Sequence, residues 1–171
     1  TAIAPTLLTA TNSTSGTISV TGATGFTATA VTNTGGGSIS LTATSGNLSI
    51  TNVTANGGGT ITLTATAGSI LDSDSDTGTT RITTTGVINL SAPAGTIGAT
   101  GGTVNGYLDI ASGFSAASLW SAQSGVFVSL TGIATLNTSA LPTITVTNAG
   151  GTIGIANVTA LGNIVVNNAL F

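Results

Sequence analysis

The chain has 171 residues, which is long enough for one domain with a substantial core. Four Asp and one Arg are its only charged residues, while 40% of the residues are hydrophobic and His, Cys and Met are absent. A net charge of −3 with a single Arg argues against binding to nucleic acid and against docking on anionic lipid, since both need several Lys or Arg.

The N-terminal segment, TAIAPTLLTA at residues 1–10, lacks the basic start of a signal peptide. Because no Met occurs anywhere, we expect a processed chain or a piece excised from a longer one. No run of about 18 apolar residues exists, so no membrane-spanning helix is predicted. Abundant Thr, Ile and Val, punctuated by Gly, predict an all-β fold.

One pattern recurs along most of the chain. It occurs as GSISLTATSGNLSI at 37–50, GTITLTATAGSILD at 59–72, GVINLSAPAGTIGA at 86–99 and PTITVTNAGGTIGI at 142–155. In each copy two apolar residues alternate with polar ones, a Gly follows, and a second apolar pair ends the unit, which predicts strand, turn, strand. Val31 and Val53 stand at the same offset before Ile39 and Ile61, which indicates a third short strand.

The leading apolar residues of the units give the repeat length. We assign them as Ile18, Ile39, Ile61, Ile88, Leu108, Val126, Ile144 and Ile164. The steps average about 20 residues, which is too short for a propeller blade and has no helix for a leucine-rich repeat. The sequence therefore predicts a parallel β-helix, or β-solenoid, of about eight coils in a single domain over residues 1–171.

All charged residues but Asp109 lie in GSILDSDSDTGTTR, residues 68–81. The step from Ile61 to Ile88 is 27 residues and the preceding step is 22, so a short insertion is predicted near 72–81. Our first interpretation is a polar loop that leaves one corner of the coil, because loops carry insertions and solvated charge.

A calcium site is the second interpretation of this segment, with contact to a partner as a third. Asp72, Asp74 and Asp76 stand at alternate positions, like the first oxygen ligands of a calcium loop. Thr77 takes the place of the required Gly, and Thr83 takes the place of the bidentate Glu. No cofactor other than calcium is expected.

The region near 99–124 departs from the repeat and holds the candidate ligand-binding residues Trp120, Tyr107 and Asp109. Aromatic rings with a polar edge suit the binding of glycans, but they suit the capping of an irregular coil equally well. We expect no catalysis, because no His or Lys accompanies the carboxylates and no His or Cys can hold a transition metal.

Thr-x-Thr rows suggest ice binding by a flat ladder of hydroxyl groups as a further alternative. Thr42 and Thr44 are expected to lie over Thr64 and Thr66 in the next coil. The following unit has Ser91 and Pro93, so the ladder is expected to end after two coils. Thr contacts between strands also stabilise a sheet without any ligand.

The C-terminal segment, NIVVNNALF, shows no polar cap. Its candidate assembly residues are Ile164, Val166, Leu170 and Phe171. A free β-helix end exposes unpaired strand edges and apolar residues. The expected partners are therefore adjoining coils of a longer solenoid, or copies of the chain that stack end to end or donate a terminal strand.

The pattern GxIxLTAxxGxI, followed by ILDSDSDTGTTRITTTGVINLSAPAGTIGATGGTVNGYLDI, resembles the repeat region of filamentous haemagglutinin-like exoproteins, which are giant bacterial surface adhesins. The matching positions are Gly68–Asp72, Asp74–Thr80, Ile88–Ala92 and Gly101–Ile110. The resemblance implies a right-handed parallel β-helix, an extracellular or cell-surface location, and a role as stalk, fibre or adhesin with surface glycans as candidate partners. The Asn-Pro motifs of that family's secretion domain are absent.

Overall fold

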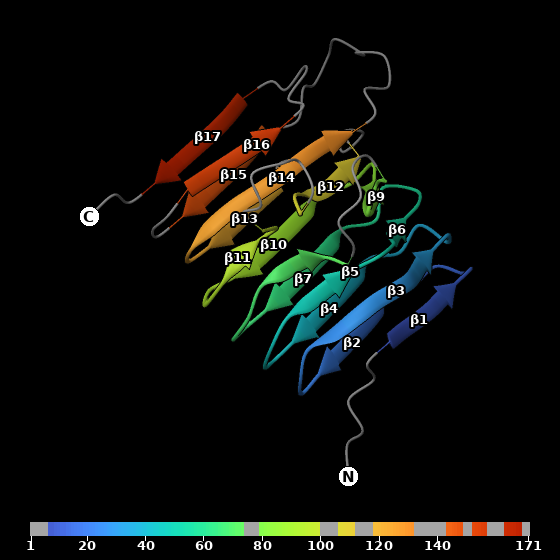
Figure 1. Ribbon diagram of the computed structural model, residues 1–171. Helices are drawn as coiled ribbons and strands as arrows, with labels where there is room; N and C mark the ends of the chain where they lie inside the picture. Colours follow the sequence, from blue (N-terminus) through green and yellow to red (C-terminus); the bar gives the residue numbers. More distant parts are fainter. Residues whose placement is uncertain are drawn as a thin grey trace.

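The computed structural model describes residues 7–73, 79–99, 106–111 and 118–131, together with the backbone of three later strands at 143–148, 152–156 and 163–168. Within these ranges the chain forms strands and turns and no helix. The strands lie in two sheets, and each strand pairing that the structure describes is parallel. Figure 1 shows the successive strands stacked along one direction from the N-terminal to the C-terminal part. The predicted all-β, solenoid-like architecture is thereby confirmed.

The smaller sheet contains seven of the described strands, in the order β17-β15-β13-β10-β7-β4-β2. Their bounds are Ile18–Gly22 for β2, Ile39–Ala43 for β4, Ile61–Ala65 for β7, Ile88–Ala92 for β10, Ser118–Ala122 for β13, Thr143–Asn148 for β15 and Asn163–Asn168 for β17. We call it the seven-stranded sheet.

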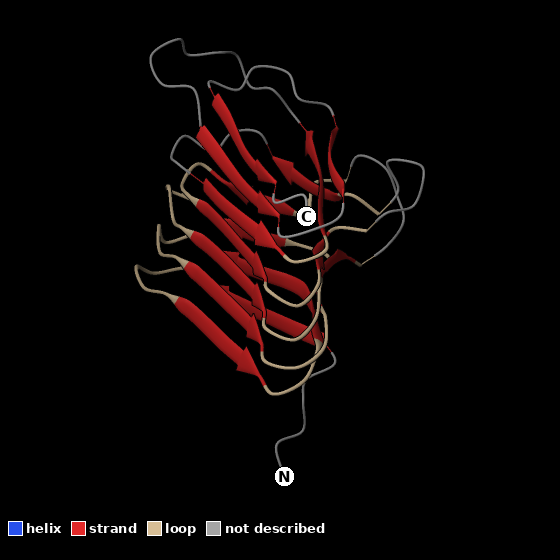
Figure 2. Cartoon of the chain, turned by 90° about the vertical axis from the view of Figure 1, so that its left-hand side faces the viewer, coloured by secondary structure: helices blue, strands red, loops and turns tan. Residues whose placement is uncertain are grey.

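The larger sheet contains ten of the described strands. They are β1 (Leu7–Asn12), β3 (Phe26–Asn33), β5 (Leu48–Ile50), β6 (Val53–Ala55), β8 (Ile70–Asp72), β9 (Ile82–Thr84), β11 (Thr96–Ile97), β12 (Leu108–Ala111), β14 (Gly125–Thr131) and β16 (Thr152–Ala156). Along the chain, a strand of the seven-stranded sheet is followed by one long strand or by two short strands of this ten-stranded sheet. The long strand β3 pairs with both β5 and β6, which together form its counterpart in the next coil. Figure 2 shows the described turns joining the stacked strands at the corners.

Inward side chains form columns that run from coil to coil. Ile39 and Leu41 of β4 lie over Ile61 and Leu63 of β7, and all four are fully buried. The residues between them are half-buried, so each strand has one face in the core and one face toward water. Because a single coil has no partner for its apolar face, the stacking of neighbours forms the continuous core.

Two of the predicted leading residues are wrong. Leu108 and Val126 lie in β12 and β14 of the ten-stranded sheet, so they do not follow Ile88 in the seven-stranded sheet. The strand that pairs with β10 is β13, in which Leu90 of β10 lies beside Trp120, and Ser118 of β13 then pairs with Ile144. Ser118 is polar, so the search for a leading apolar residue passed over it.

Columns of glycine allow the corners to stack closely. A Cβ on Gly59 would overlap the carbonyl oxygen of Gly37, and a Cβ on Gly68 would overlap that of Gly46 one coil earlier. Gly95 repeats this relation with Gly68. The recurring Gly of the sequence pattern is therefore required by the approach of one turn to the next.

Candidate functional site

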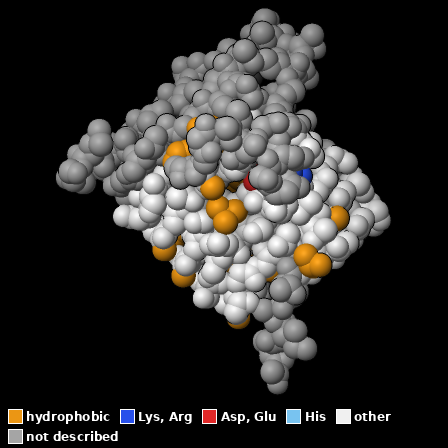
Figure 3. Space-filling view, viewed as in Figure 1, with side chains coloured by type: hydrophobic (Ala, Val, Ile, Leu, Met, Phe, Trp, Pro, Cys, Tyr) orange, Lys and Arg blue, Asp and Glu red, His pale blue; other side chains and the backbone are white. Residues whose placement is uncertain are grey.

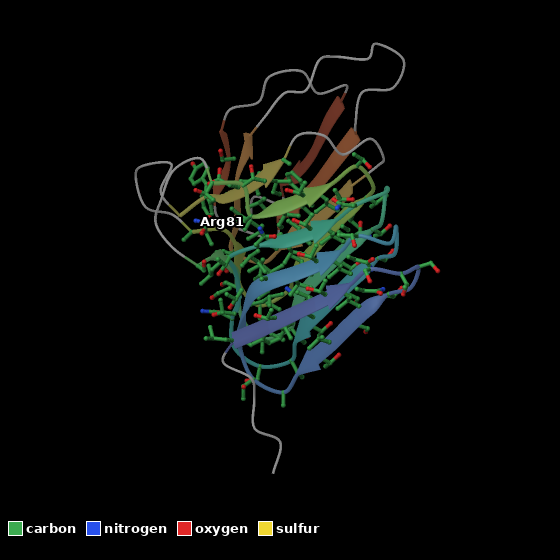
Figure 4. The ribbon with its side chains drawn as sticks, turned by 90° about the vertical axis from the view of Figure 1, so that its right-hand side faces the viewer. Arg81 is labelled. Atoms are coloured by element: carbon green, nitrogen blue, oxygen red, sulfur yellow. The ribbon has the colours of Figure 1, made fainter. Side chains whose placement is uncertain are left out.

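The charged segment forms a buried ion pair between the end of β8 and the residue that precedes β9. Nε of Arg81 donates to both carboxylate oxygens of Asp72, at 2.9 and 3.1 Å. The two side chains are 4% and 1% exposed for Arg81 and Asp72 respectively. Figure 4 shows Arg81 on the ribbon among the side chains of the ten-stranded sheet.

Backbone hydrogen bonds on both sides hold Arg81 in position. Its N–H donates to the carbonyl of Asp109 at 2.9 Å, and its own carbonyl accepts from the N–H of Val53 at 2.8 Å. Nη1 of Arg81 reaches the carbonyl of Thr51 at 3.5 Å. Arg81 therefore continues the ladder between neighbouring coils while its side chain turns back to Asp72.

This geometry accounts for two of the four charged residues of the segment, Asp72 and Arg81. Asp72 ends β8 and Arg81 precedes β9, so the ion pair joins the two sides of the predicted insertion, of which residues 74–78 lie outside the described residues. Burial of two opposite charges is tolerated when they are paired and hydrogen-bonded. The sequence predicted the insertion at this place, but it did not predict that its two ends are joined.

The calcium prediction concerns three Asp residues, of which Asp74 and Asp76 lie outside the described residues. Asp72 is described, and both of its carboxylate oxygens accept from Arg81. Among the residues that the structure describes, no group of three or more His, Cys, Asp or Glu side chains could hold a metal ion. The calcium site therefore stays a prediction.

The candidate ligand-binding residues lie on two different sheets. Trp120 of β13 is fully buried and stands in the inward column of Leu90. Tyr107 is half-buried just before β12, with its ring centroid 5.9 Å from that of Phe127. The side chain of Asp109 in β12 is buried, at 2% exposure of the residue. Burial of Trp120 in the core favours a role in packing over one in stacking on a glycan.

The candidate assembly residues are placed only in part. Ile164 and Val166 belong to β17, at register positions that match Ile144 and Val146 of β15. Leu170 and Phe171 lie outside the described residues. Among the strands that the structure describes, β17 is the last of the seven-stranded sheet.

The predicted contact of Thr42 with Thr64 on the outward face of the seven-stranded sheet is confirmed. An outward column of hydroxyl residues runs in register through Thr21, Thr42, Thr64, Ser91 and Ser121. Ser91 follows Thr64 as expected, but the prediction of two Thr coils was one too few, because Thr21 precedes Thr42. The signal was present in TISVTG at residues 17–22, which matches the later units. In Figure 3 the visible described surface shows little charge, with scattered hydrophobic side chains.

Comparisons with protein-family models, with curated proteins and with solved structures found no match. In the part of the chain that the structure describes, no helix has the length and apolar character needed to span a membrane.

Proposed function

We propose that the chain is a non-catalytic structural or adhesive module of an extracellular fibre or cell-surface adhesin, of the filamentous haemagglutinin-like kind. In this proposal the solenoid is right-handed and has about eight coils, if the partial coil that contains β1 is counted. The repeat pattern that resembles this family, from residues 37 to 110, supports the proposal.

The observation that carries the proposal is the stacking of inward apolar side chains from coil to coil. The column that contains Ile18, Ile39, Ile61 and Ile88 keeps one register through four coils, and every side chain after the first is fully buried. Such stacking makes a molecule whose length grows with each repeat while its cross-section stays constant, which suits a stalk or fibre.

The described carboxylates also support a role without catalysis. Asp72 is held by Arg81, and Asp109 is buried in β12. A general acid or base must be able to reach the proton of a bound substrate. Neither of these two groups is presented to solvent, so the described charges serve the fold in this proposal.

The test is to find the native polypeptide that carries this sequence in its source cells. Antibodies against the purified chain should label intact cells, and protease added outside should remove the label. The denatured mass then separates the alternatives: a mass near 16.2 kDa indicates a fibre subunit, and a much larger one indicates a stalk segment. Label that appears only after the cells are broken would overturn the proposal.

A second candidate, the binding of ice, is favoured by the hydroxyl column on the seven-stranded sheet. Successive coils place Thr21, Thr42 and Thr64 about 4.8 Å apart on an outward face. If this face binds ice, Thr42→Tyr should abolish the inhibition of ice recrystallisation by the purified chain. Ser49→Tyr, on the outward face of the other sheet, should leave the inhibition intact. Absence of inhibition by the unsubstituted chain would eliminate this candidate.

A further inference from the structure

The first coil is less buried than the coils that follow it. In β4 the inward residues Ile39 and Leu41 are fully buried, but their counterparts Ile18 and Val20 in β2 are only half-buried. Ile18 and Val20 pack against the core from one side, as Leu8 in β1 also does. The N-terminal end of the described solenoid therefore presents apolar side chains that another coil would cover.

Unpaired strand edges accompany this apolar end. Among the described strands, β1 pairs only with β3, and β2 pairs only with β4. The N–H of Ile18 donates toward β4, to the carbonyl of Ser38 at 3.0 Å. Since successive residues of a strand direct their N–H groups to opposite sides, the N–H of Ser19 points to the open side of β2. No charged residue occurs in β1 or β2 to discourage pairing at this edge.

At the opposite end, the last strand of each sheet also has one edge without a partner among the described strands. There β16 is the last described strand of the ten-stranded sheet, and β17 is the last of the seven-stranded sheet. The described chain begins with a strand of the ten-stranded sheet and ends with a strand of the seven-stranded sheet. Consequently the ten-stranded sheet projects by one strand, β1, at the first end, and the seven-stranded sheet projects by one strand, β17, at the other.

We propose that copies of this chain associate head to tail through the two projecting strands, β1 and β17. The projecting β17 of one copy pairs in parallel with β2 of the next, and the projecting β1 pairs with β16. Continuing the register of the seven-stranded sheet places Ile164 beside Ile18 and Val166 beside Val20. The inference rests on the proposed fibre role and specifies its partner, which is a second copy of the same chain.

The physical gain comes from two sources. The half-buried apolar side chains of the first coil leave water, and the open N–H and C=O groups of both edges gain partners. The two contacting surfaces differ, so the interface is heterologous and each added copy leaves a new open end. The product is a filament whose strands lie across its long axis.

Sedimentation velocity over a range of concentrations tests the association. The unsubstituted chain should form species that lengthen with concentration. Val20→Asp places a carboxylate in the inward column of the open coil, where it remains partly hydrated in the single chain but would be buried without a partner at the junction. This variant should stay monomeric, and Thr21→Asp, which alters the outward face of the same strand, should associate as the unsubstituted chain does.

A cross-linking experiment tests the register and does not depend on the stability of the Asp variant. The chain has no Cys, so Thr21→Cys combined with Asn167→Cys introduces one matched pair across the expected junction. Oxidation should yield a ladder of multimers that collapses on reduction. The mismatched combination of Thr21→Cys with Asn163→Cys should yield much less.

Three results would contradict the head-to-tail contact: a monomer at all concentrations, equal loss of association in both Asp variants, or equal cross-linking of matched and mismatched pairs. None of them would bear on whether the native polypeptide lies at the cell surface, which the antibody experiment decides separately. Failure of the contact would thus leave the stalk alternative of the proposed function standing.

Discussion

The Asp72 carboxylate and the Arg81 guanidinium meet inside the wall of the solenoid, where both side chains are almost inaccessible to water. Nε lies 2.9 Å from one carboxylate oxygen and 3.1 Å from the other, so the charge of Asp72 is compensated locally. At this depth the loss of one partner matters more than the net strength of the pair, because the remaining charge cannot be hydrated.

We expect Arg81→Met to destabilise the fold by about 3–5 kcal/mol, since it leaves the buried Asp72 charge without its cation. The double variant Arg81→Met with Asp72→Asn should be less destabilised than the sum of the two single variants. Urea unfolding of all four proteins measures this coupling. Additive effects would show that the contact contributes nothing as a pair.

Calcium should leave the melting temperature unchanged relative to a chelator. The reason is that the carboxylate of Asp72, the first of the three Asp residues, is already engaged by Arg81. Thermal unfolding followed by circular dichroism in calcium and in chelator provides the measurement. A clear rise with calcium, lost in Asp74→Asn, would instead support the calcium interpretation of this segment.

The sequence predicted this residue cluster only in part. The long step from Ile61 to Ile88 located the insertion, because repeat length is visible in the sequence. The contact between Asp72 and Arg81 was not predicted. It depends on the position of Arg81 before β9, which the repeat pattern does not determine. Trp120 shows the same limit, since an isolated aromatic residue in an irregular region carries no periodic signal of burial.

At the scale of the elements, turns limit the distance between coils as much as strands do. Gly68 lies in a corner where the carbonyl oxygen of Gly46 occupies the place of a Cβ, and the side-chain oxygen of Asn47 is 2.8 Å from the same point. Its backbone is not in the left-handed region, so the requirement for Gly here is steric.

Gly68→Ala should therefore destabilise the solenoid by about 1–3 kcal/mol, as overpacking of a tight site typically does. Urea unfolding compares it with Thr66→Ala, an exposed position in the same corner, which should change stability little. If Gly68→Ala were as stable as the unsubstituted chain, the account of close corner stacking would be wrong.

Element prediction succeeded where apolar alternation and corner Gly agreed, from β4 to β10. It failed at β12 and β14, because Leu108 and Val126 show the same alternation as strands of either sheet. Only pairing distinguishes the sheets, and the pairing partner of β10 begins with the polar Ser118. Variable coil length between residues 92 and 118 removed the regular spacing that had identified the earlier coils.

At the scale of the whole molecule, parallel stacking gives the two ends of the described solenoid different and complementary edges. The inward column of Val20, Leu41, Leu63, Leu90 and Trp120 also continues from coil to coil without a polar residue, as the proposed fibre role requires. Composition and repeats predicted this architecture because both reflect the core. Neither identifies what the outer surface contacts, since surface Thr and Ser serve stability and recognition equally.

The most direct measurement is X-ray diffraction from oriented filaments of the concentrated chain. If coils stack head to tail, strands lie across the filament, and a reflection at about 4.8 Å should appear along the filament axis. Electron microscopy of the same sample should show unbranched filaments one solenoid wide. A 4.8 Å reflection perpendicular to the axis, or a chain that forms no filaments, would contradict end-to-end stacking.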